Sequence, residues 1–167
     1  MIIPHNSLWY TFLFVYLPTA TILNPSFENP AVTTDAFGTP SYWSGDKFSY
    51  LSVIISGSND WGGILAADGN QLLAFGGGEL KQSLEFKPGL TYVLAFFAAS
   101  WDKSGSLTAT VGENSMLVQS PLLSTTMANY SMWFVADSFS KSVIITGYRS
   151  VLDYVTVNQG IPSYPIV

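Results

Sequence analysis

The chain has 167 residues, a length that suits one domain with a sizeable hydrophobic core. Apolar residues make up 48 % and charged residues only 10 %, whereas an ordinary soluble domain carries roughly 25 % charged residues. This composition excludes intrinsic disorder. The net charge is -5 with six Lys and Arg residues, which excludes electrostatic nucleic-acid binding because phosphate contacts need clustered cations.

The reactive residue types are scarce. With no cysteine, the chain has no disulfide, thiolate zinc site, iron–sulfur cluster or thiol catalyst. The one histidine, His5, lies near the start of the sequence, and a catalytic triad or a two-histidine metal site needs a better placed or a second imidazole. Eleven Asp and Glu residues could supply a glycosidase pair, but no spacing rule locates such a pair in a β-fold. We therefore expect a protein that is not an enzyme.

The N-terminal segment contains an apolar run over residues 8–17, LWYTFLFVYL, which ends at Pro18. This is about half of the roughly 20 residues of a membrane-spanning helix, so no span is expected. A signal peptide ending near Ala20 is one interpretation, but the opening MIIPHNS lacks the Lys or Arg of a signal. We favour a retained arm, residues 1–20, that lies against the same domain or a partner subunit and buries its aromatic residues there: Trp9, Tyr10, Phe12, Phe14 and Tyr16.

From residue 21 to 167, short apolar runs alternate with turn residues, which predicts one all-β domain. After a long loop over residues 26–45, we expect the following strands: 47–56, 71–75, 79–87, 91–100, 105–111, 115–119, 130–136, 142–147 and 151–158. No stretch has a convincing helical period. This strand count favours a two-sheet β-sandwich with jelly-roll topology, carrying an N-terminal extended arm.

Three of these segments give more detailed predictions. Residues 79–87 alternate, so Leu80, Gln82, Leu84 and Phe86 face one way. Residues 91–100, TYVLAFFAAS, are apolar on both faces and predict a strand that is covered on both sides. The run 76–78 is three glycines without the Lys and Ser or Thr of a phosphate-binding loop, so we expect a hairpin turn there.

Three tryptophans, Trp43, Trp61 and Trp101, lie beside Gly, Ser or Asp in predicted loops. Such loop tryptophans can form a stacking platform for sugar rings. The alternative is that they close the ends of the sandwich.

Two carboxylates are informative as a pair. Glu28 follows the first sandwich segment and Asp153 lies at the start of the last strand. Because first and last strands of such sandwiches are commonly neighbours, the two side chains could form, with backbone carbonyls, an oxygen-rich site for a structural Ca²⁺. Alternatively, they cap turns or pair with Lys47 or Arg149.

Several short motifs resemble one known family. They are Asn24-Pro25-Ser26-Phe27-Glu28, Trp43, Asp68-Gly69-Asn70-Gln71, Leu80-Lys81-Gln82-Ser83-Leu84, Lys87-Pro88-Gly89 with Tyr92, Leu94 and Phe96, Trp133-Phe134-Val135-Ala136, and Leu152-Asp153-Tyr154-Val155. Over residues 22–158, their order resembles carbohydrate-binding modules with a galactose-binding-like jelly-roll fold. The resemblance implies a non-catalytic protein that binds glycans through aromatic residues and holds a structural calcium at Glu28 and Asp153.

We therefore expect a non-enzymatic structural or attachment subunit of a larger oligomeric assembly, with the arm docking on a partner subunit. A phage virion is the expected assembly, as a decoration, fibre or tail protein, and the expected location is a virion or extracellular surface. The alternative is a secreted carbohydrate-binding module whose first twenty residues are a cleaved signal.

Overall fold

The computed structural model describes residues 20–46, 50–119 and 122–160. The predicted arm lies outside the described residues except for Ala20, which is buried against the main core. Among the described residues, no helix has the length and hydropathy needed to cross a membrane.

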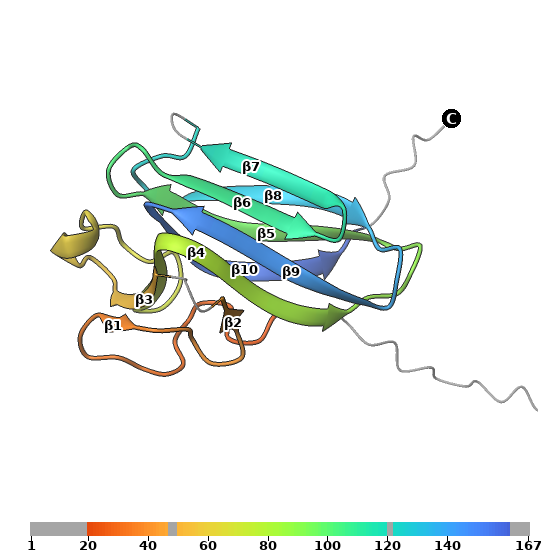
Figure 1. Ribbon diagram of the computed structural model, residues 1–167, viewed down its shortest axis with the longest axis horizontal. Helices are drawn as coiled ribbons and strands as arrows, with labels where there is room; N and C mark the ends of the chain where they lie inside the picture. Colours follow the sequence, from red (N-terminus) through yellow and green to blue (C-terminus); the bar gives the residue numbers. More distant parts are fainter. Residues whose placement is uncertain (1–19, 47–49, 120–121, 161–167) are drawn as a thin grey trace, which may run out of the picture.

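Two antiparallel sheets pack face to face to form a β-sandwich, as Figure 1 shows. The described strands are β1 (Ala36–Phe37), β2 (Ser44–Gly45), β3 (Tyr50–Ile55), β4 (Gln71–Glu85), β5 (Thr91–Ser100), β6 (Ser106–Val111), β7 (Asn114–Gln119), β8 (Ala128–Val135), β9 (Ser140–Tyr148) and β10 (Ser150–Gln159), with one short 3-10 helix, η1 (Asn59–Trp61). Sheet 1 has the order β1-β3-β4-β10-β5-β8, and sheet 2 has the order β2-β4-β9-β6-β7. The all-β sandwich predicted from the sequence is confirmed.

Strand β4 belongs to both sheets. Its residues 71–77 pair with β3 in sheet 1, and its residues 78–85 pair with β9 in sheet 2. The three glycines 76–78 lie at this crossing, where Gly77 and Gly78 have φ values of 152° and 130° that side-chain-bearing residues rarely adopt. The predicted hairpin turn is therefore wrong, because the glycines bend one continuous strand from the first sheet into the second.

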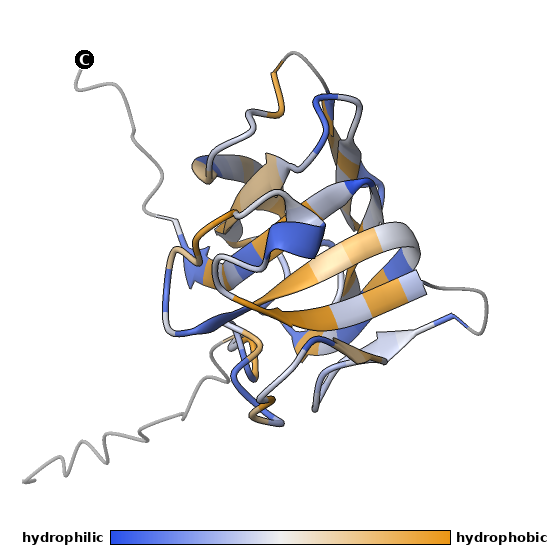
Figure 2. Ribbon diagram, turned by 90° about the vertical axis from the view of Figure 1, so that its left-hand side faces the viewer, coloured by the Kyte–Doolittle hydropathy of each residue, from blue (hydrophilic) through white to orange (hydrophobic). Residues whose placement is uncertain are grey.

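The main core lies between the sheets and is filled by the inward residues of each strand. The predicted inward face Leu80, Gln82, Leu84 and Phe86 is confirmed, since all four residues are buried. Figure 2 shows the same alternation as hydrophobic and hydrophilic bands along the strands. Strands with this alternation place their apolar side chains between the two sheets, and this packing holds the sheets together without a disulfide.

A second, smaller cluster lies on the other face of sheet 1. It contains Ile54, Leu72, Ala74, Ala99 and Val151, and the loop carrying η1 supplies residues that pack against it. This cluster covers only the end of β5. Over the rest of that strand, the inward residues are buried and the outward residues are half-buried, so the predicted cover on both sides is wrong there. The reason is that β5 lies next to the edge strand β8, where the second cluster does not reach.

Candidate functional site

Two of the three predicted binding tryptophans come together. The rings of Trp61 and Trp101 meet edge to face, with centroids 4.8 Å apart and planes at 83°. The Trp61 Nε1–H donates a hydrogen bond to Asp35 Oδ2 at 3.0 Å. Both tryptophans are half-buried and pack against the second cluster, so they close one end of sheet 1 and keep part of their surface exposed.

Trp43 occupies the core instead. Its side chain is only 7 % exposed, and its ring packs against Phe27 with centroids 5.8 Å apart. The Nε1–H donates to the carbonyl oxygen of Asn24 at 3.2 Å, which satisfies the polar end of the buried ring. Because no ring face is free for stacking, the assignment of Trp43 as a sugar-binding residue is corrected to a core residue.

Glu28 and Asp153 hold the same loop from two sides. Asp153 Oδ2 accepts hydrogen bonds from the backbone N–H groups of residues 67 and 68, at 2.7 and 2.9 Å. Glu28 Oε1 accepts from the N–H groups of residues 70 and 71, both at 2.7 Å. The structure thus brings the two predicted carboxylates to residues 67–71, although these residues are far from both in sequence.

Asp153 is fully buried, and this burial raises the pKa of its carboxyl to about 7. The backbone N–H groups of Asp68, Tyr154 and Ala67 oppose the rise, while the nearby Asp68 carboxylate adds to it. The described residues contain no group of three or more His, Cys, Asp or Glu that could hold a metal ion. A cation bound at this loop would therefore need main-chain carbonyl oxygens in addition to Glu28 and Asp153.

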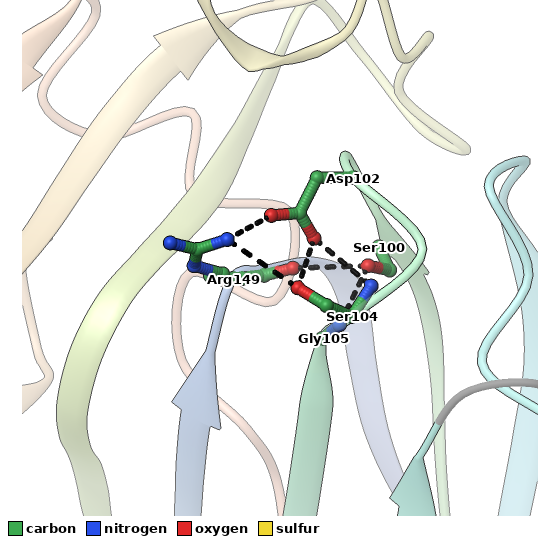
Figure 3. A network of polar contacts seen from close by, with 5 residues as sticks. All are labelled: Ser100, Asp102, Ser104, Gly105 and Arg149. Carbon is green, nitrogen blue, oxygen red and sulfur yellow. Dashed lines mark hydrogen bonds and ion pairs between the residues drawn. The ribbon is translucent and has the colours of Figure 1, made fainter.

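The alternative partner of these carboxylates, Arg149, is engaged elsewhere, as Figure 3 shows. Its Nη1 lies 2.6 Å from Asp102 Oδ2, and Asp102 Oδ1 accepts bonds from the N–H and hydroxyl of Ser104. The Ser100 hydroxyl donates to the Arg149 carbonyl oxygen and accepts from the Gly105 N–H. These bonds tie the β9–β10 turn to the loop after β5. The other alternative partner, Lys47, lies outside the described residues.

An aromatic and neutral surface lies on sheet 1 where the second cluster does not cover it. We call it the outer face. It consists of residues from β5, β8 and β10 that the strand register places side by side: Val93, Ala95, Phe97, Asn129, Ser131, Trp133, Tyr154, Thr156 and Asn158. None of these residues carries a charge.

Trp133 dominates this outer face. Its side chain is 59 % exposed, and it lies opposite Val93 in the register of β8 and β5. The Cε3–Cζ3 edge of its ring lies against Gly160, where any side chain would displace it. Further along the face, the rings of Phe97 and Tyr154 are 6.5 Å apart. The sequence analysis did not select Trp133, although its neighbours Met132 and Phe134 point inward and strand alternation therefore indicates an outward tryptophan.

A groove borders the outer face along β10, and we call it the β10 groove. Its volume is about 320 Å³, near the lower end of the range for ligand cavities. Its walls come from the first described segment, from the turn before β5 and from β10, and they include Ala20, Ile22, Leu90, Tyr92, Val155 and Val157.

No protein-family model and no curated protein matches the chain. Among solved structures, a family 61 carbohydrate-binding module in complex with β-1,4-galactotriose is 20 % identical with a TM-score of 0.54, covering 84 % of this chain and 99 % of that chain. The chain has the galactose-binding-like β-sandwich fold of carbohydrate-binding modules. A xylan-binding family 22 module from Paenibacillus barcinonensis is similar in this fold at 14 % identity, with a TM-score of 0.53 and 85 % and 96 % coverage.

The same fold occurs as a part of larger proteins. The enzymatically active domain of tailspike protein 4 from bacteriophage CBA120 matches at 13 % identity with a TM-score of 0.54, covering 84 % of this chain but only 21 % of that chain. Some of the other matched modules are also parts of enzymes. At these identities, the likeness is one of fold, and the function must be argued from the surface of this chain.

Proposed function

We propose that this domain binds a neutral glycan on the outer face of sheet 1 and does not catalyse a reaction. The observation that supports it best is Trp133, a large aromatic side chain that is 59 % exposed and lies opposite Val93 on the outer face. The exposed ring can stack on a sugar ring, and the neighbouring Phe97 and Tyr154 provide further aromatic surface on the same face. This proposal includes the glycan partner and the non-enzymatic role that the sequence predicts.

The chemistry of the outer face suits a sugar chain. Tryptophan and tyrosine rings stack on the apolar C–H faces of pyranoses, while amide and hydroxyl side chains bind sugar hydroxyls. Asn129, Ser131 and Asn158 supply the polar groups between the aromatic residues. Along β5, the distance from Val93 beside Trp133 to Phe97 is four residues, about 13 Å, which suits a linear oligosaccharide.

A titration tests this proposal. Calorimetric titration of the protein with soluble β-galactan and xylan, and with polygalacturonate as an acidic counterpart, should show binding to a neutral glycan only. Trp133→Ala should weaken this binding about 10- to 100-fold, because it removes an aromatic burial worth about 1.5 to 3 kcal/mol. Phe37→Ala is the matched control, since Phe37 is an exposed aromatic residue on the distant strand β1. Unchanged affinity of the Trp133 variant would contradict the proposal.

Trp61 and Trp101 enter the same proposal as contacts for a longer chain. They lie at the end of β5 beyond Phe97, with part of each side chain exposed. Trp101→Ala should therefore weaken the binding of long oligosaccharides and leave that of short ones unchanged. An equal loss for all chain lengths would contradict this role.

We further propose that a structural Ca²⁺ binds where Glu28 and Asp153 hold residues 67–71. Both residues are carboxylates, the ligand type that Ca²⁺ prefers, and the cation would compete with the backbone N–H groups that they bind in the structure. The burial of Asp153 disfavours its charged form, and a bound cation would reverse this. Ca²⁺ should raise the melting temperature and a chelator should lower it, whereas Asp153→Ala should lose this response and Asp102→Ala, at an exposed carboxylate, should keep it. A chelator without effect on the parent protein would contradict the proposal.

As a second function, we propose that the domain is an attachment subunit of a larger assembly, such as a virion. The likeness in fold to a part of a phage tailspike and the low share of charged residues support this role. So does the part of β10 that has no strand partner among the described residues, as described below. The mass of the native protein tests it against the secreted alternative, because a mature N-terminus near Thr21 would remove the arm.

A further inference from the structure

Among the described residues, strand β10 has no strand partner beyond residue 152 on the side away from β5. Strand β10 pairs with β5 along most of its length, but it pairs with β4 only at residues 150–152. Beyond this point β4 continues into sheet 2, and the segment 20–25 takes its place beside β10. This segment is not a strand, and the β10 groove lies between it and β10.

The backbone direction shows which groups face this groove. The Val155 N–H donates to the carbonyl oxygen of Pro25, away from β5, whereas the Gly160 N–H donates to Thr91 of β5. Backbone groups alternate in direction along a strand, and the register from residue 156 to 159 is regular. The N–H and C=O groups of Val157 and Gln159 therefore point toward the groove. Within the described part of the chain, no strand pairs with them.

We propose that the β10 groove accepts the apolar arm, residues 8–17, of a second copy of this chain as an added strand. This inference rests on the assembly role proposed above. An unpaired strand edge beside an apolar groove is the surface that strand addition uses, with the backbone giving affinity and the side-chain pockets giving specificity. The arm supplies a matching ligand, because all but one of its ten residues are apolar or aromatic.

The sequence between the arm and the groove favours exchange between copies. Only Pro18 and Thr19 separate Leu17 from Ala20, which already lines the groove. An arm folding back on its own groove would need a two-residue hairpin, whose favoured types require positive φ at the first central residue. Proline is restricted to φ near -65°, so a proline at position 18 disfavours such a hairpin. Two copies that exchange arms would form a closed, two-fold dimer.

Cysteine cross-linking tests this proposal cleanly, because the chain has no cysteine of its own. Full-length Phe14→Cys and Gln159→Cys variants, mixed and mildly oxidised, should give a cross-linked dimer that contains both variants. Mixing Phe14→Cys with Tyr50→Cys, an exposed position on β3, is the control and should give none. Absence of the mixed dimer would overturn the proposal. A double variant that cross-links within one monomer at high dilution would overturn the exchange between copies.

A backbone variant provides a second readout. Gln159→Pro removes one N–H that faces the groove and leaves the bonds of Asn158 and Gly160 to β5 intact. The dissociation constant of the dimer should rise about 10- to 100-fold, because a two-fold dimer of this variant loses two backbone hydrogen bonds, one in each groove. An unchanged dimer in sedimentation experiments would count against the added strand. Glycan titration of a chain covering residues 20–167 separates the two functions, since it should bind glycan as the full chain does while remaining a monomer.

Discussion

Asp153 should make the metal-free protein less stable as the pH rises from 4 to 7. Burial raises the pKa of this carboxyl to about 7 from its ordinary value of 3.8. Between these values, the folded chain holds a proton that the unfolded chain has lost, so the free energy of unfolding falls with increasing pH. The difference, 7 minus 3.8, is about 3 pH units, which corresponds to about 4 kcal/mol. For a chain of this length, that is roughly 8 to 16 °C in Tm.

Thermal melting in the presence of a chelator measures this effect, with Asp153→Asn as the partner variant. Both oxygens of Asp153 accept backbone hydrogen bonds, so the amide N–H₂ of the asparagine and the hydroxyl of a protonated Asp153 each face a backbone donor. The asparagine does not titrate, so the Tm of the variant should lack the fall that Asp153 causes in the parent. Asp102 and Asp137 have lowered pKa values, so they stabilise the folded protein at neutral pH and this stabilisation is lost as the pH falls. Their effect is the same in the parent and in the variant, so it cancels in the comparison.

The difference in Tm between the parent and the variant thus isolates the buried carboxyl. The Tm of the parent minus that of the variant should fall steadily from pH 4 to pH 7. A difference that stays constant over this range would refute the reasoning, because it would show that Asp153 does not change its protonation there.

Three further variants probe the fold. Gln82→Met removes three hydrogen bonds to the backbone of the first described segment and of the loop before β2. It should lower the free energy of unfolding, measured in urea, by about 2 to 4 kcal/mol. An unchanged free energy of unfolding would show that water replaces these bonds. Gly147→Ala would force a methyl group into the ring of Phe75 and should cost about 1 to 3 kcal/mol by calorimetry, and normal stability would mean that this ring can move. Asp102→Asn weakens the exposed pair with Arg149 and should shift Tm least of the three, so a shift as large as that of Gln82→Met would contradict this ranking.

The strands themselves could be predicted well because the alternation that defines them is local. The predicted range 91–100 coincides with β5, and the alternation over residues 79–87 correctly gave the inward face of β4. The two-residue strands β1 and β2 were expected as loop, since each exists only through a partner far away in the sequence. The crossing at the three glycines was missed for the same reason, because a bend between sheets and a hairpin turn need the same residue type.

The candidate site shows a similar division. The approach of Glu28 and Asp153 to a common loop could be inferred from their places near the two ends of the domain. The burial of Trp43 could not, because the position of a loop tryptophan depends on which residues fold over it. The exposure of Trp133 could have been predicted, because side chains alternate along a strand and its neighbours are apolar residues that face the core. The β10 groove depends on where β4 leaves sheet 1, and no local pattern gives that position.

The shared strand β4 also makes the unfolding of the two sheets cooperative. In a sandwich whose sheets meet only through side chains, one layer can open while the other keeps its backbone bonds. Here the fifteen residues of β4 form one continuous strand, whose first half pairs in sheet 1 and whose second half pairs in sheet 2, so neither sheet can lose its part of β4 without disturbing the other. Amide hydrogen exchange should therefore be equally slow in the two halves of β4, with Leu73 and Leu80 released in the same global event.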